Sequence, residues 1–113
     1  MLNQTTLLNE LEIRDTDVHS SGGALFGAQG AIQGLIVIEN KLNQIVSIQA
    51  QGRALGSEVW QNIGAATNVA ATVGTTPGAG NIALTVSWPE VQITATCGGA
   101  PASGSVTAWL SWG

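Results

Sequence analysis

The stretch IVSIQAQ, residues 45–51, alternates apolar and polar side chains over its whole length. Its apolar members Val46, Ile48 and Ala50 fall on one side of an extended chain, and the intervening serine and glutamines fall on the other, because successive side chains of a strand point to opposite faces. A period of two predicts a strand with one face in a core and the other in water.

Similar runs flank this strand and are separated by turn residues every eight to twelve positions or so, the spacing typical of an all-β domain. Residues 34–39, GLIVIE, are more continuously apolar, which is typical of a strand covered on both faces. We therefore expect a single small antiparallel β-sandwich, or a jelly-roll-like barrel, of about seven or eight strands. The expected further strands cover 58–63, 67–73, 82–87, 91–97 and 105–112, with loops at 75–80 and 98–104.

The first 17 residues differ from the rest, because they hold five of the ten charges and a cluster of leucines at 2, 7, 8 and 11. Leu7, Leu8 and Leu11 could share one face of a short helix, and an extended conformation fits the segment equally well. We predict an N-terminal arm over residues 1–17, joined by a flexible turn at 19–23 to a sandwich domain over 18–113.

The low charge of the chain excludes several classes of partner. Charged residues make up 9% of the sequence, against about 25% in a typical soluble domain, and the net charge is −4. The only cations are Arg14, Lys41 and Arg53, too few to neutralise a row of phosphates, so we expect neither nucleic-acid nor membrane binding. No basic leader with a cleavage site and no run of 18 apolar residues occurs in the sequence.

The residues needed for catalysis or metal binding are scarce. A Cys97–His19 pair would need an exposed thiol, whereas the strand register places Cys97 on the apolar face with Val91 and Ile93. The segment Asp15-x-Asp17-x-His19 would align three ligands on an extended strand, but it lacks a fourth ligand, so a solvated acidic edge is favoured over a cation site. We expect no enzymatic activity, no catalytic or metal residues and no cofactor.

The last strand, 105–112, offers a candidate interface. Its register places Val106, Ala108, Leu110 and Trp112 on one face and Trp109 on the other, between Thr107 and Ser111. An aromatic side chain on a hydroxyl-lined face has three interpretations: a loop of its own subunit covers it, a partner subunit covers it, or it stacks on a sugar. Trp60 and Trp88 are expected in the core or at its rim.

Five segments together resemble small β-sandwich proteins of tailed-bacteriophage virions, of the capsid decoration or cement type. They are the turn and strand SGGALF at 21–26, the strand QIVSIQAQ at 44–51, the hairpin GSEVWQNIG at 56–64, and the two strands WPEVQITAT at 88–96 and GSVTAWLSW at 104–112. The hairpin departs from the common Asp-Gly or Asn-Gly turn, and the apolar N-terminal arm is longer than usual.

This resemblance implies a non-enzymatic structural protein on the capsid surface, made in the host cytoplasm. Its expected partners are the major capsid protein or neighbouring virion subunits, and a homo-oligomer, preferably a trimer, is expected. The alternatives are a head-fibre or tail component and a carbohydrate-binding β-sandwich module. An extended arm can add a strand to a neighbour. The candidate interface residues are therefore Leu7, Leu8, Leu11, Ile13, Thr107, Trp109 and Ser111.

Overall fold

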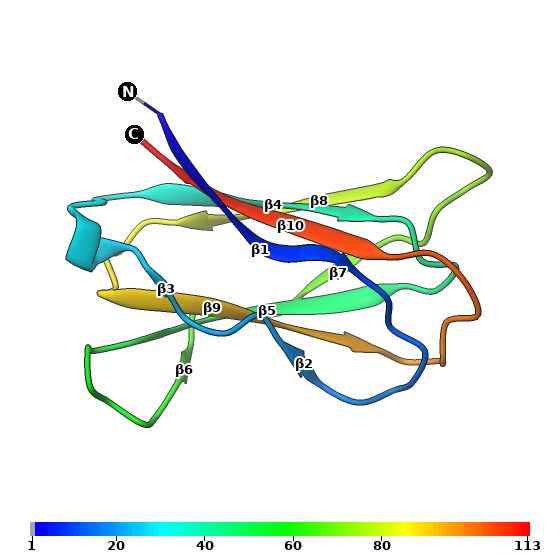
Figure 1. The fold of residues 1–113 in the computed structure, drawn as a ribbon, viewed down its shortest axis with the longest axis horizontal. Helices are drawn as coiled ribbons and strands as arrows, with labels where there is room; N and C mark the ends of the chain where they lie inside the picture. The colour runs from blue at the N-terminus through cyan, green and yellow to red at the C-terminus, as the bar shows by residue number, and fades with distance from the viewer. Residues whose placement is uncertain (1) are drawn as a thin grey trace.

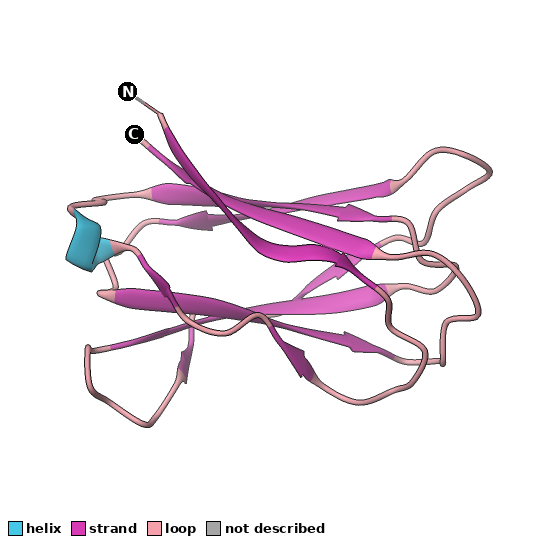
Figure 2. Ribbon diagram, in the orientation of Figure 1, coloured by secondary structure: helices cyan, strands magenta, loops and turns pink. Residues whose placement is uncertain are grey.

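The computed structural model describes residues 2–113 as two antiparallel β-sheets packed face to face (Figure 1, Figure 2). The strands are β1 (Asn3–Leu11), β2 (His19–Ser20), β3 (Ala24–Leu25), β4 (Gly34–Asn40), β5 (Val46–Arg53), β6 (Gln61–Asn62), β7 (Thr67–Val69), β8 (Gly78–Leu84), β9 (Glu90–Cys97) and β10 (Val106–Trp112). In the described residues the only helical element is a 3₁₀ turn, η1, at Gly27–Gln29. The predicted all-β sandwich is confirmed.

The order of strands is that of a jelly roll. Sheet A runs β1-β10-β4-β8, and sheet B runs β2-β9-β5-β6, with β3 also paired to β9 and β7 also paired to β5. If β2 and β3 are counted as one broken edge strand, and β6 and β7 as another, residues 2–113 hold eight strands. Renumbered from 1 to 8 along the chain, these strands lie in the order 1-8-3-6 in sheet A and 2-7-4-5 in sheet B. This is a long hairpin wrapped into two sheets, as a jelly roll is.

The core lies between the sheets. The inward residues of β5, which are Val46, Ile48 and Ala50, are at most 1% exposed, as the period-two pattern of residues 45–51 predicts. They pair in register with Cys97, Ala95 and Ile93 of β9, which are equally buried. Each Val, Ile or Leu side chain buried in this way contributes about 1.5–3 kcal/mol.

The prediction of an N-terminal arm separate from the sandwich is wrong for residues 3–11. This segment is β1, the edge strand of sheet A, and it pairs with β10 from Asn3↔Trp112 to Leu11↔Val106. The register shifts on both sides of Leu8, and Glu10 has a positive φ of 49°. Such bulges break the alternation of side chains, so the leucines give no strand pattern in the sequence and still pack inward.

The predicted loop at 75–80 is also wrong in part, because Gly78 and Gly80 lie within β8. A Cβ on Gly78 would lie 1.7 Å from the Ala70 carbonyl oxygen, and one on Gly80 would lie 2.7 Å from a methyl group of Val69. The glycines therefore permit the close approach of β8 to β7 rather than a turn. The strands expected at 58–63 and 67–73 shorten to β6 and β7.

Asn40, at the end of β4, ties the two sheets together. Its side chain is fully buried, and its amide donates to the carbonyls of Gln44, Val69 and Ala70 at 3.0–3.3 Å. Its carbonyl accepts a bond from the Leu42 N–H at 3.0 Å. One side chain thus provides hydrogen-bond partners for backbone groups in the turn into β5 and at the end of β7, where sheet A meets sheet B.

Asn40→Ala should lower the free energy of unfolding by about 3 kcal/mol or more, because it leaves several buried backbone groups without partners, each at a cost of about 1–3 kcal/mol. Asn81→Ala, on the exposed face of β8, is the matched control and should stay within about 0.5 kcal/mol of the wild type. Urea denaturation of both variants measures the difference. Equal stabilities would show that Asn40 does not hold the sheets together.

Candidate functional site

Trp109 lies near the middle of the outer surface of sheet A. Its strand, β10, runs between β1 and β4 (Figure 1), and Trp109 pairs in register with Thr6 on one side and Val37 on the other. The inward residues Val106, Ala108 and Leu110 are fully buried, whereas Thr107, Trp109 and Ser111 are half-buried on the outer side. The predicted register of the last strand is confirmed.

The outer side of β4 continues this surface and corrects a second expectation. Residues 34–39 have the apolar pattern of a strand covered on both faces, but Leu35 is 39% exposed and Val37 is 37% exposed. Only Ile36 and Ile38 point into the core. Within residues 2–113 sheet B covers one side of β4, and the apolar residues of the other side face outward next to Trp109.

We define the Trp109 face as the outward residues of sheet A. All but one of these residues have an uncharged side chain. They are Gln4, Thr6, Leu35, Val37, Glu39, Ala79, Asn81, Ala83, Thr107, Trp109 and Ser111. The exception is Glu39, which pairs with Lys41 at 3.4 Å at one end of the sheet. An uncharged surface of this kind can be covered by another protein without burying an unpaired charge.

At the other end, where the two termini lie side by side (Figure 1), the Trp109 face leads into an apolar hollow. The hollow has a volume of about 500 Å³, and its walls include Leu2, Leu35, Ala83 and Trp112. Leu2 itself is 70% exposed. Apolar side chains thus line a recess next to the Trp109 face.

The predicted interface residues divide into two groups. Thr107, Trp109 and Ser111 lie together on the Trp109 face, whereas the four residues of the expected arm point into the sandwich. Leu8 and Ile13 are 5% and 0% exposed, and Leu7 and Leu11 are half-buried against the core. In this structure Leu7, Leu8, Leu11 and Ile13 therefore stabilise the fold and are not available as anchors. The sequence pattern missed Leu35 and Val37 as members of the exposed face.

The remaining tryptophans have structural partners. Trp88 packs against the core and lies over Gly52, whose missing Cβ would stand 2.4 Å from the indole ring. Trp60 is half-buried and holds the guanidinium of Arg53 at 4.1 Å from its ring centroid. Arg53 also donates to Glu90 at 2.7 Å. These contacts agree with the expected place of Trp60 and Trp88 at or near the core rim.

Cys97 is a free, buried cysteine at the inner face of β9, as the register predicts. Burial raises the pKa of its thiol, and the charge of Asp15 raises that pKa further. A raised pKa lowers the fraction of thiolate, which is the reactive form. Cys97 thus has the environment of a packing residue.

Asp15, Asp17 and His19 do not align as three ligands on a strand. Asp15 accepts a bond from the Asp17 N–H at 3.1 Å, so the chain turns here, and the Asp15 carboxylate lies 2.8 Å from Nε2 of His19. Across residues 2–113, no three His, Cys, Asp or Glu side chains gather closely enough to hold a metal ion. The hydrogen bond with His19, and then the one from Asp17, lowers the pKa of Asp15.

Comparisons with known proteins relate the fold to phage and viral proteins. No protein-family model and no curated protein sequence matches the chain. Among solved structures, it is similar to the PBSX exported protein XepA, with a TM-score of 0.71 and 16% identity over 98% of this chain. The chain spans only 37% of XepA.

Two further structures are similar to nearly the whole chain. The SPBc2 prophage-derived protein YomS has a TM-score of 0.58 at 12% identity, covering 99% of this chain and 92% of its own. The infectious bursal disease virus VP2 subviral particle has a TM-score of 0.53 at 11% identity, covering 98% of this chain and 32% of that one. At these identities the likeness shows a shared fold. In the described residues no helix is long and apolar enough to cross a membrane.

The contact between Asp15 and His19 has a measurable consequence. The pKa of Asp15 should lie below its ordinary value of 3.8, and His19→Ala should raise it, because the larger of the two stabilising hydrogen bonds is then lost. Carboxyl-carbon NMR during an acid titration measures the pKa of Asp15 in the wild type and in His19→Ala. An unchanged Asp15 pKa in His19→Ala would show that the two side chains do not interact in solution.

Proposed function

We propose that this chain is a non-enzymatic structural protein of a virus particle, and that it docks on a neighbouring virion subunit through the Trp109 face. In its specific form, the proposal is a capsid decoration or cement protein bound to the major capsid protein. The observation that carries the proposal is the outward side of β4, where Leu35 and Val37 flank Trp109 without cover. A contiguous exposed apolar surface rimmed by polar residues is typical of a protein interface.

The composition of the Trp109 face suits such an interface energetically. Tryptophan is enriched among the few residues that dominate binding energy, and it acts most strongly when neighbouring residues exclude water from it. Thr107 and Ser111 flank Trp109 along β10 and offer hydroxyl groups for hydrogen bonds across the contact. The near absence of charge favours a long-lived contact over one that depends on electrostatic steering.

The solved structures that share this fold support a location in a virus particle, without indicating a position within it. The fold is shared with the PBSX exported protein XepA, with a prophage-derived protein and with a protein of a subviral particle. Jelly rolls recur in viral capsid proteins and in lectins, so the fold alone leaves the function open, and the Trp109 face has to carry the specific claim. A head-fibre or tail position would use the same face against a different neighbour.

Self-association is a separate part of the proposal. A homo-trimer would place three copies around a local threefold axis of the shell, which is the arrangement implied by the resemblance to decoration proteins. Subunits in such a ring meet through two different surfaces. In this arrangement the Trp109 face contacts the shell and takes no part in the contacts between copies.

Val37→Lys should abolish or strongly weaken attachment to particles, because it places an unpaired charge in the centre of the Trp109 face. The matched control is Val73→Lys, in an exposed loop where Val73 is 78% exposed. Co-sedimentation of each variant with virions lacking the protein measures attachment. Both variants should keep the melting temperature within a few degrees of the wild type, since neither position lies in the core.

Trp109→Ala should have a similar effect on attachment. Normal decoration by both Val37→Lys and Trp109→Ala would contradict the docking role of this face. A loss of about 3 kcal/mol or more in the isolated Trp109→Ala protein would instead identify Trp109 as a residue of the fold.

A further inference from the structure

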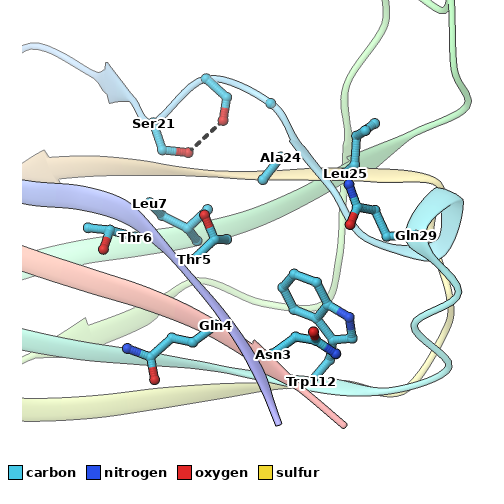
Figure 3. Close-up of a pocket in the computed structure, with 12 residues that line it drawn as sticks. Asn3, Gln4, Thr5, Thr6, Leu7, Ser21, Ala24, Leu25, Gln29 and Trp112 are labelled. Carbon is cyan, nitrogen blue, oxygen red and sulfur yellow. Dashed lines mark hydrogen bonds between the residues drawn. The ribbon is translucent and has the colours of Figure 1, made fainter. Parts of the chain in front are cut away.

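A second hollow lies at the side of the sandwich, along the β1 edge of sheet A, and borders the Trp109 face at Gln4 and Thr6. It is a cleft of about 490 Å³ between β1 of sheet A and the segment that joins β2 to β3 in sheet B (Figure 3). The 3₁₀ turn and the end of β10 form the rest of its wall. This volume falls within the range of about 300–1,000 Å³ that is typical of small-molecule sites.

Two glycines shape one wall of the cleft. Gly22 adopts a φ of +76°, which interrupts the edge strand between β2 and β3. At Gly23 a Cβ would lie 2.1 Å from the Glu90 carboxylate, so a side chain cannot be placed there without displacing that group. At these two positions the wall of the cleft is therefore backbone, and the side chains of Ser21, Ala24 and Leu25 complete it.

The lining of the cleft is polar and carries no ionisable side chain. Asn3 and Thr5 on β1 and Gln29 in the 3₁₀ turn contribute two amides and a hydroxyl (Figure 3). No side-chain hydrogen bond within residues 2–113 uses these three groups, whereas the hydroxyl of Ser21 is already engaged with Gly22 and Ile93. Phosphate or carboxylate ligands would lack a cation here, and a lipid tail would leave these polar groups unpaired.

An aromatic ring completes the cleft. Figure 3 shows the indole of Trp112 standing between Asn3 and the Gln29 side of the wall. Phe26 meets this ring edge-on, at 6.2 Å between centroids and 78° between planes, which holds the indole in a fixed orientation. A rigid aromatic surface beside neutral hydrogen-bonding groups matches a ligand with one apolar and one hydroxyl-bearing side.

We propose that this cleft binds a neutral saccharide unit. The C–H face of a pyranose ring would lie against Trp112, and its hydroxyl groups would exchange hydrogen bonds with Asn3, Thr5 and Gln29. The cleft borders the Trp109 face at Gln4 and Thr6, but none of the groups assigned to the sugar belongs to that face. The proposal therefore does not rest on the docking role of the Trp109 face, and the sugar would touch neither Trp109 nor Val37. A virion protein with this site would hold glycan chains while it is attached to the particle.

The test uses the full ¹⁵N-labelled chain and NMR titration with a defined panel: glucose, galactose, mannose, N-acetylglucosamine, their disaccharides and, as a charged comparison, glucuronic acid. At least one neutral sugar should shift the indole N–H of Trp112 and the backbone amides of β1. Glucuronic acid should bind more weakly than glucose, since the cleft offers no cation to its carboxylate. Tighter binding of disaccharides than of monosaccharides would identify a glycan chain, and not a free sugar, as the ligand.

Two exposed residues provide the variants, because substitution of Trp112 would also remove its contact with Phe26. Asn3→Ala and Gln29→Ala should each weaken binding by about tenfold, and Asn81→Ala on β8 should leave it unchanged. Three outcomes would overturn the proposal: no neutral sugar of the panel binds, the affinity is the same in Asn3→Ala and Gln29→Ala as in the wild type, or the shifts centre on Trp109. Particle attachment is measured separately, so failure of either proposal is recognised on its own.

Discussion

The pairing of β10 between β1 and β4 is the constraint on which the rest of the structure depends. It brings the first and last strands of the chain together, in register from Asn3↔Trp112 to Leu11↔Val106, and makes β10 an interior strand of sheet A. Because β10 is interior, one of its faces completes the core and the other displays Trp109 near the middle of the sheet. The same pairing leaves β1 as an edge strand, beside which the neutral cleft opens.

Much of the fold follows from local pattern. Strands β5, β9 and β10 have one buried and one more exposed face, and their alternation predicts both the strand and its register, including the side on which Trp109 lies. The pattern fails where a distant contact decides the conformation. The bulges of β1 place Leu7 and Leu8 against the same core, and the extended course of β8 depends on glycines that fit against Ala70 and Val69. No periodic pattern of apolar and polar residues in the sequence predicts such contacts.

The two candidate sites differ in how far the sequence predicts them. Thr107, Trp109 and Ser111 follow from the register of one strand, but their neighbours Leu35 and Val37 come from β4, and only the strand order places them alongside. The apolar run 34–39 suggests burial of both faces, and the structure shows that one of these faces is open. The cleft combines residues from both ends of the chain and from the turn at 22–29, so it becomes visible only in three dimensions.

We propose that another protein covers the Trp109 face of sheet A, whose only charged member among the described residues is Glu39. Hydroxyl-radical footprinting of virions and of the free protein tests this claim most directly, because it compares all four tryptophans in one experiment. Oxidation of Trp109 should fall several-fold in the particle, whereas that of Trp60, on the other sheet, should stay unchanged. Equal oxidation of Trp109 in the free and particle-bound protein would contradict the account.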